Sequence, residues 1–287
     1  MSKTKIFVIY HIPEEPIISD VYQPISVGRK KNAFPASFLR DDIGENISDK
    51  NPTYNEMTAI YWVFKHVNEL DCDYIGFAHY RRLFCFSDLS KTAYVRKKID
   101  KSMIEIDNSK LERFFKDYDL MAPYPNRYKS VRHHYEKAHN KTDVDLVLDI
   151  IRVIKPNYYK AACEYFYSSR EYSYNMFVMK KNDFIEYGSF IFDVLGEFEK
   201  MKKYIDRLYI SERLTGVFIS YLLSKQYKVL HLPVIHIRKK SFKKSLNEVN
   251  ENFKENKNNG FFYKTKSMFL HLMPICLEQA LRRYKTK

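Results

Sequence analysis

The sequence predicts an α/β fold in which helices cover a mostly parallel sheet. Short runs of β-branched and aromatic residues alternate along the chain with segments whose apolar residues recur at helical spacing. The chain has 287 residues, 45% of them hydrophobic and 16% aromatic, which is enough apolar material for one or two folded domains and excludes global disorder. The sequence has no internal repeat, so an array of repeated units is also excluded.

The strands are predicted from apolar runs bounded by turn residues. The first covers residues 5–10, and Pro13, Pro16 and Pro24 then predict a loop. Further strands are expected at 74–78, 118–122, 174–179 and 227–237, the last with Pro233 at its middle.

The helices are predicted where apolar residues form one stripe at helical spacing. The first is capped by Ser48 or Asp49, has Pro52 in its first turn and carries Met57, Tyr61, Phe64 and Val67 on one stripe. The others are expected at 145–154, 182–202 and 211–224. Strands and helices therefore alternate, which is the pattern of a parallel sheet with crossover helices.

Positive charge is concentrated toward the C-terminus. The chain carries 49 Lys and Arg against 35 Asp and Glu, a net charge of +14, and residues 238–287 alone contribute 13 Lys and Arg against 4 Glu. A nucleic-acid binder needs its positive charge on the folded reading surface, so we expect no nucleic-acid partner. We divide the chain into a domain at 1–237 and a basic tail at 238–287.

Within the tail, residues 261–287 contain an apolar run flanked by Lys and Arg. The run is too short to span a bilayer. It fits a helix that lies on an anionic membrane surface with its basic residues toward the lipid headgroups. A C-terminal helix packed on the domain fits the same pattern, and both interpretations stay open.

The cysteines and glycines exclude several kinds of site. The 4 cysteines lie far apart without the paired spacing of a zinc site, and the N-terminus lacks the pattern of a signal peptide, so we expect a cytosolic protein with reduced thiols. The 7 glycines form neither a Gly-x-Gly-x-x-Gly nor a Walker motif. A bound nucleotide must therefore be held by other groups.

Three Asp-x-Asp pairs are candidates for holding a divalent cation against a diphosphate. Ligands of parallel sheets bind beyond the carboxyl ends of the strands. The pairs at 71–73 and 117–119 precede strands, so we interpret them as solvated turns. The pair at 143–145 opens a helix and is either a helix cap or an acceptor-site group.

A dense basic run, His79-Tyr80-Arg81-Arg82, directly follows the strand at 74–78. Guanidinium groups donate paired hydrogen bonds to phosphate and can neutralise a diphosphate without a metal. We therefore predict that at least one of the two arginines binds phosphate. The alternative is an Arg that pairs with a structural carboxylate.

Two further clusters are candidate binding groups. In the polar segment that leads into the first helix, the backbone amides together with Asn46, Lys50 and Asn51 are expected to face an anion. His134 and His139 belong to a second cluster, without Cys or a His-Glu-x-x-His layout. We predict that they orient sugar hydroxyls and do not bind zinc.

An ordered series of motifs resembles one protein family. The series is YQPISVG at 22–28, ENISDKNP at 45–52, NEMTAIYW at 55–62, YIG at 74–76 continuing to the basic run, YNMFVMKK at 174–181 and SERL at 211–214. It resembles the bacterial capsule and exopolysaccharide glycosyltransferases of the GT-A group that were long catalogued as a domain of unknown function. The resemblance covers about residues 4–237.

The resemblance implies a GT-A-like α/β/α sandwich, followed here by the C-terminal helical tail. It also implies a UDP-sugar donor, a lipid-linked oligosaccharide acceptor and a peripheral location at the inner face of the cell membrane. Some relatives transfer galactofuranose or galactose. In the GT-A pattern Tyr10 and His11 face the nucleoside with Val27 and Gly28 close by, although the Lys that usually follows is Ile12 here.

The basic run at 79–82 occupies the place where Asp-x-Asp binds a metal in other GT-A enzymes. We therefore expect transfer with no cofactor and no Mn²⁺ or Mg²⁺. An inverting reaction also needs a carboxylate base near the acceptor hydroxyl. Glu212 is the first candidate base and Asp143 the second, whereas Asn175 and Arg213 are expected to contact the sugar or the acceptor.

Two other functional classes stay open. The first is a non-catalytic scaffold within a polysaccharide assembly complex. The second is a basic nucleic-acid-binding protein, which would need aromatic side chains stacked on a basic face.

Overall fold

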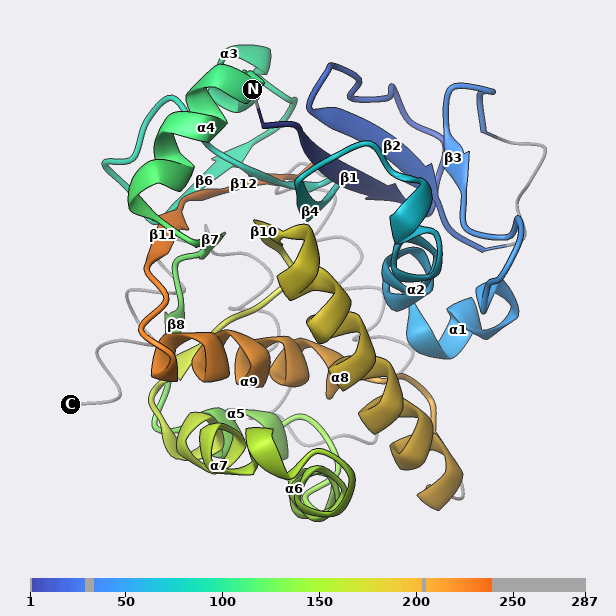
Figure 1. Cartoon of the computed structure of the whole chain (residues 1–287), viewed down its shortest axis with the longest axis vertical. Helices are drawn as coiled ribbons and strands as arrows, with labels where there is room; N and C mark the ends of the chain where they lie inside the picture. The colour runs from blue at the N-terminus through green and yellow to red at the C-terminus, as the bar shows by residue number, and fades with distance from the viewer. Residues whose placement is uncertain (1, 29–33, 203–204, 239–287) are drawn as a thin grey trace, which may run out of the picture.

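The computed structural model describes residues 2–28, 34–202 and 205–238, and it confirms the α/β fold with a mostly parallel sheet (Figure 1). The main strands follow the order β11-β7-β10-β4-β1-β2-β3. Their bounds are β1 Thr4–Tyr10, β2 Tyr22–Ser26, β3 Leu39–Arg40, β4 Tyr74–His79, β7 Leu120–Pro123, β10 Phe177–Lys180 and β11 Val229–Leu232. Only β10 runs against its neighbours, β4 and β7, in this path through the described residues.

A second branch of the sheet leaves β4. Strand β5 (Arg82–Phe84) runs antiparallel to β4, β12 (Val234–Ile237) antiparallel to β5, and β6 (Ala93–Arg96) parallel to β12. Since β5 runs antiparallel to both β4 and β12, β12 points in the same direction as β4. Strands β1 and β2 are parallel to β4, so β1, β2, β4 and β12 all end at the same edge of the sheet. A separate small ladder pairs β8 (Asn126–Arg127) with β9 (Arg170–Glu171).

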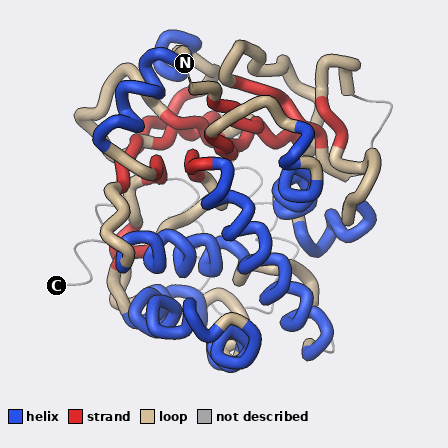
Figure 2. The backbone as a smooth tube through the Cα atoms, viewed as in Figure 1, coloured by secondary structure: helices blue, strands red, loops and turns tan. Residues whose placement is uncertain are grey.

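Helices cover both faces of the sheet (Figure 2). Their bounds are α1 Asn51–Tyr54, α2 Met57–Lys65, α3 Lys101–Ile104, α4 Asn108–Asp117, α5 Val131–Glu136, α6 Asp143–Ile154, α7 Tyr159–Tyr167, α8 Lys181–Met201 and α9 Ser211–Ser224. Short 3-10 turns occur at Ser48–Lys50, Val67–Glu69 and Pro156–Tyr158. Within the described ranges, none of these helices combines the length and apolar character needed to cross a bilayer.

The core consists of two apolar clusters, one on each face of the sheet. Because successive residues of a strand point to opposite faces, β1 contributes to both. Phe7 and Ile9 pack with α2 and with α6 to α9, whereas Ile6 and Val8 pack under α3 and α4. The central strand is thus buried on both sides, which explains its continuous apolar sequence.

The loop predicted after the first strand contains a strand, β2, that the sequence analysis missed. Pro24 lies in the middle of β2, opposite Val8 of β1. A proline has no N–H for a sheet ladder and is usually confined to positions that need none. On the other side of β2, pairing with β3 begins only at Ile25, so no ladder bond to β3 is needed at Pro24.

The first predicted helix is interrupted. It is divided into a 3-10 turn, α1 and α2, and the break lies at Asn55, whose φ is 50° and ψ −127°. Such a positive φ cannot continue a helix. Apolar spacing on both sides of the break is helical, so the pattern alone did not reveal it.

The other predicted elements agree with the structure to within a few residues. Helix α9 has the predicted bounds, and the strand expected at 227–237 is split into β11 and β12 at Pro233, whose carbonyl accepts a hydrogen bond from the backbone of Cys85 at 2.9 Å. The tail predicted at 238–287 lies outside the described residues except for Arg238. The proposed membrane-surface helix therefore stays a prediction.

Candidate functional site

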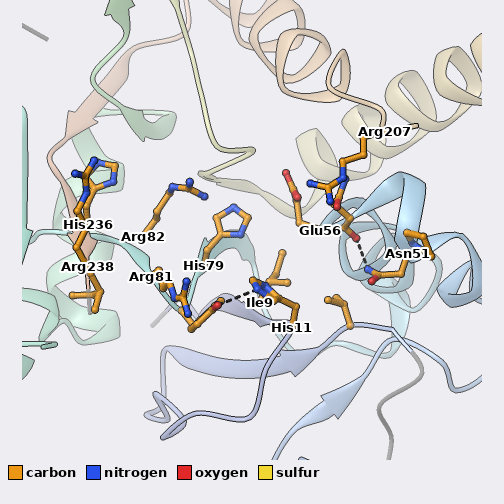
Figure 3. Close-up of a pocket in the computed structure, with 15 residues that line it drawn as sticks. Ile9, His11, Asn51, Glu56, His79, Arg81, Arg82, Arg207, His236 and Arg238 are labelled. Carbon is orange, nitrogen blue, oxygen red and sulfur yellow. Dashed lines mark hydrogen bonds between the residues drawn. The ribbon is translucent and has the colours of Figure 1, made fainter. Parts of the chain in front are cut away.

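A cavity of about 590 Å³ lies at the edge of the sheet where β1, β2, β4 and β12 end (Figure 3). This volume is in the usual range for small-molecule sites. Among the described residues that line the cavity are four arginines, three histidines and one carboxylate, namely Arg81, Arg82, Arg207, Arg238, His11, His79, His236 and Glu56. A lining with this excess of guanidinium groups fits an anionic ligand.

The basic run predicted from the sequence forms the tight turn between β4 and β5. His79 ends β4 and pairs with Arg82 of β5, so Tyr80 and Arg81 make the turn. The Arg81 guanidinium lies 4.8 Å from the centroid of the Tyr80 ring, and its distance to a carboxylate oxygen of Glu14 is 3.7 Å. The Arg81 side chain stays 46% exposed beside this long ion pair, so its guanidinium can still bind a ligand in the cavity that it lines.

His79 is neutral at pH 7 and is held in one tautomer. Its Nε2 lies 2.6 Å from the carbonyl oxygen of Tyr174. Because a carbonyl only accepts hydrogen bonds, Nε2 carries the proton and Nδ1 is left as an acceptor. Burial, reinforced by the nearby Arg82, lowers the pKa of His79 to about 4, and the same two causes lower the pKa of His236 to about 3. The positive charge of the cavity therefore comes from its arginines.

Glu56 reaches the cavity from the break between α1 and α2. Its Oε1 accepts a hydrogen bond from Nδ2 of Asn175 at 2.8 Å. Asn175 is buried, and its own Oδ1 accepts a hydrogen bond from the Thr215 hydroxyl at 2.6 Å. The carboxylate is thus held by a side chain whose orientation is itself fixed.

Unusual backbone conformations gather around the same cavity. In the described residues, positive φ outside glycine occurs at Asn55, Tyr174, Asn175 and Gln226. All but Gln226 either line the cavity or hold a residue that lines it. Such conformations cost roughly 1–3 kcal/mol each and persist where the surrounding structure enforces them, often at functional sites.

The predicted nucleoside side of the site is partly assembled. His11, Val27 and Asn51 line the cavity, and Gly28 lies beside it. Gly28 has a φ of 76°, and a Cβ at this position would lie 3.0 Å from Oδ1 of Asn51. Glycine is therefore required here by both its conformation and its close approach.

Three other predicted nucleotide-binding residues do not line the cavity. The Tyr10 ring is buried in the core, and its hydroxyl accepts a hydrogen bond from the backbone of Ile17 at 3.0 Å. Lys50 forms an ion pair with Glu199 of α8 at 2.6 Å. Asn46 makes hydrogen bonds within its own loop.

Glu212 lies near the cavity but is not among its lining residues. One of its oxygens accepts a hydrogen bond from Arg213 at 3.2 Å, and Arg213 also reaches Glu171 at 3.4 Å. Burial raises the pKa of the Glu212 carboxyl above its ordinary value, an effect that Arg213 opposes and Glu56 reinforces. The partly exposed Glu212 and the buried Arg213 thus belong to an ion network with Glu171 outside the lining of the cavity.

The remaining predicted site residues lie in or beside this network, away from the lining. His134 is 2.7 Å from a carboxylate oxygen of Glu171, and His139 stacks against a tyrosine ring with 4.3 Å between centroids. Asp143 is buried and forms an ion pair with Lys202. The structure does not bring these three residues into the cavity.

The Asp-x-Asp pairs also lie outside the lining of the cavity. As predicted, Asp71 and Asp119 precede β4 and β7, whereas Asp143 opens α6 and Asp145 binds Arg132 at 2.6 and 2.8 Å. Over the described ranges, no three His, Cys, Asp or Glu side chains are grouped as metal ligands.

The sequence analysis missed four of the Arg, His and Glu residues that line the cavity. Glu56 falls inside what was predicted to be a continuous helix, and Arg207 precedes α9 in a loop with no recognisable motif. His236 is the one polar residue of β12, a signal that could have been noticed. Arg238 was assigned to the tail, yet its backbone N–H donates to the carbonyl of Arg96 at 2.9 Å, which extends the pairing of β12 and β6.

Comparison with known proteins identifies a family and a structural neighbour. No curated protein matches the chain. The chain is similar to the apo structure of the WbbM bifunctional glycosyltransferase, with 28% sequence identity and a TM-score of 0.72. The likeness covers 82% of this chain but 45% of that one, so the matched part spans less than half the length of the neighbour. A family model described as a domain of unknown function matches residues 5–230, and the chain belongs to this family, DUF4422.

Proposed function

We propose that the protein is a glycosyltransferase that moves one sugar from a UDP-sugar to a glycan acceptor in bacterial surface polysaccharide synthesis. The observation that carries this proposal is the convergence of four arginines in one cavity at the carboxyl ends of parallel strands. The leaving group of such a donor is a diphosphate, which guanidinium groups bind with paired hydrogen bonds. The likeness to WbbM, itself a glycosyltransferase, supports the same class of reaction.

The arginines would contribute most while the sugar is being transferred. The acceptor oxygen attacks the anomeric carbon as the bond from that carbon to the β-phosphate oxygen breaks. Negative charge then grows on the diphosphate, so cations fixed against it stabilise the transition state more than the bound donor. Arg81 and Arg82 fit this role because Arg81 lies in the turn after β4, Arg82 begins β5, and both line the cavity, whereas the neutral His79 and His236 do not supply charge.

We also propose that these arginines take the place of a metal ion. The support for this is the position of the basic run at the carboxyl end of β4, where its guanidinium groups enter the cavity. Transfer should then be unaffected by EDTA. Loss of transfer in EDTA with recovery on adding Mn²⁺ would contradict the proposal.

Following the family resemblance, we propose galactofuranose or galactose as the sugar and a lipid-linked oligosaccharide as the acceptor. The basic tail at 239–287 would bring the enzyme to the anionic membrane surface where such acceptors reside. Of the two bases predicted from the sequence, Glu212 lies near the cavity, and Asp143 is engaged by Lys202.

A donor screen tests the proposed function. Purified protein is incubated with a panel of UDP-sugars and a membrane extract that contains lipid-linked glycans, with and without EDTA. We expect one UDP-sugar to be consumed with release of UDP and labelling of the lipid fraction. Binding of UDP without any transfer across the panel would favour the scaffold alternative, and failure to bind UDP at all would rule out the proposed donor class.

A further inference from the structure

Glu56 is the carboxylate that the structure places in the cavity. Among the described lining residues it is the only acidic side chain. In Figure 3, Glu56 and Arg207 lie on one side of the cavity, and Arg82, His236 and Arg238 lie on the other. A diphosphate bound by the arginines of the second side would therefore leave the Glu56 carboxylate across the cavity from the leaving group.

A chain of hydrogen bonds orients the Glu56 carboxylate. The Tyr187 hydroxyl lies 2.8 Å from that of Thr215, Thr215 donates to Oδ1 of Asn175 at 2.6 Å, and Asn175 donates to Oε1 of Glu56 at 2.8 Å. Tyr187, Thr215 and Asn175 are all buried. Within the described chain, Oε2 of Glu56 has no hydrogen-bond partner, so this oxygen is available to a ligand.

The backbone also fixes Glu56. The preceding residue, Asn55, takes the positive φ that ends α1, and α2 begins at the following residue, Met57. Met57 is fully buried in the core. Glu56 is thus held between a strained turn and a buried anchor, which limits the positions that its side chain can reach.

Glu212, the base predicted from the sequence, is placed differently. It is not among the lining residues, and its carboxylate is engaged by the buried Arg213 at 3.2 Å. A general base must come within hydrogen-bond reach of the proton it removes. Glu56 lines the cavity in which an acceptor would bind, whereas Glu212 does not line it and is paired with Arg213.

We propose that Glu56 is the catalytic base, an inference that rests on the glycosyltransferase function proposed above. The acceptor oxygen forms a bond to the anomeric carbon, the bond from that carbon to the β-phosphate oxygen breaks, and its electron pair leaves with UDP. The proton of the acceptor hydroxyl passes to the Glu56 carboxylate. Because this is one direct displacement, the configuration at the anomeric carbon is inverted.

The variants Glu56→Gln and Glu212→Gln test the assignment. Glutamine keeps the size of the side chain and an Oε1 that still accepts from Asn175, so the fold should be retained. For E56Q we expect UDP affinity and acceptor KM within about threefold of wild type but kcat lower by about 100-fold or more. The matched variant E212Q should retain kcat within about tenfold.

The outcomes separate the base assignment from the proposed function. If wild type neither binds UDP nor transfers sugar, the proposed function and this inference both fail. If wild type is active and E56Q keeps its kcat, or if E212Q alone loses it, only the assignment of Glu56 is overturned. As a second measurement that does not depend on a variant, NMR of the wild-type product should show inversion at the anomeric carbon, and retention would overturn the base role.

Discussion

At the scale of single residues, the charge of the cavity depends on which side chains can stay protonated there. Arginine remains charged in nearly any environment, whereas a buried imidazole gives up its proton. The four arginines therefore supply positive charge to the cavity. His79 is neutral there, and its Nε2 proton is fixed by the carbonyl of Tyr174. The sequence predicted Arg81 and Arg82 because a basic run after a buried strand is a local signal. Arg207 and Glu56 have no such signal, because only the tertiary fold brings them to the cavity.

The depressed pKa of His79 makes stability depend on pH. Its pKa is about 4 in the folded protein and about 6.5 when unfolded, so between these values the unfolded chain binds the additional proton. The free energy of unfolding should therefore be fully retained above pH 6.5 and fall as the pH drops toward 4. His79→Gln removes the titrating imidazole. The fall in the free energy of unfolding on acidification should therefore be smaller in this variant by on the order of 2 kcal/mol.

Urea unfolding at pH 7.5 and at pH 4.5 measures this effect. The difference in free energy between the two pH values should be smaller in H79Q than in wild type, and His236→Asn should act in the same direction because the pKa of His236 is also lowered. Equal pH dependence in wild type and both variants would contradict the burial of neutral histidines at this site.

At the scale of secondary-structure elements, regular apolar patterns predicted the fold well. Helix α9 was predicted with its observed bounds. The strand β2 was missed because Pro24 indicates a loop. A proline is accommodated there because the pairing of β2 with β3 begins only at Ile25, and this pairing cannot be read from the residues around Pro24. The break at Asn55 was missed because its cost is offset by distant contacts, including the hydrogen bond between Glu56 and Asn175. Both of these errors lie beside the cavity, which Asn55 and the residue after β2, Val27, line.

Close packing of β4 against β10 gives a prediction at this scale. A Cβ added at Gly76 would lie 2.7 Å from Cγ2 of Val178 and 2.8 Å from the carbonyl oxygen of Phe177. Because a backbone atom cannot move aside easily, Gly76→Ala should lower the free energy of unfolding by about 1–3 kcal/mol.

Gly196→Ala is the matched control. Gly196 lies in α8, and a Cβ there would meet no atom within 4 Å. This substitution should raise stability by up to about 1 kcal/mol because alanine favours a helix. Thermal unfolding measures the stability of both variants. A G76A variant as stable as G196A would show that β4 and β10 are not in the close contact described.

At the scale of the whole molecule, the cavity is assembled from segments that are far apart in the sequence. Strands β1, β4 and β12 deliver His11, His79 and Arg238 to one edge of the sheet. The ordered series of motifs predicted the domain and its family. The residues that line the cavity could be identified only once the order and direction of the strands were known. The basic tail beyond Arg238 was recognised from its charge alone.

The charge of the tail predicts binding to anionic membranes by a protein that carries it. Each Lys or Arg near such a surface contributes about 1 kcal/mol at moderate salt. Co-sedimentation with vesicles that contain an anionic phospholipid should therefore be strong at low salt and weak at high salt, and a variant with glutamine at Arg282, Arg283, Lys285 and Lys287 should bind less. If the protein bound anionic vesicles no more strongly than neutral phosphatidylcholine vesicles, this result would contradict a membrane role for the tail.

The central claim is that Arg81 and Arg82 bind the diphosphate of a UDP-sugar, and calorimetric titration with UDP tests it most directly. UDP should bind wild type, and the double variant Arg81→Ala, Arg82→Ala should bind it about 10-fold to 100-fold more weakly, since hydrogen bonds to charged groups contribute roughly 1.5–3 kcal/mol. Lys50→Ala, which removes a cation outside the cavity lining, should leave the affinity unchanged. Equal UDP affinity in wild type and the double arginine variant would contradict the claim.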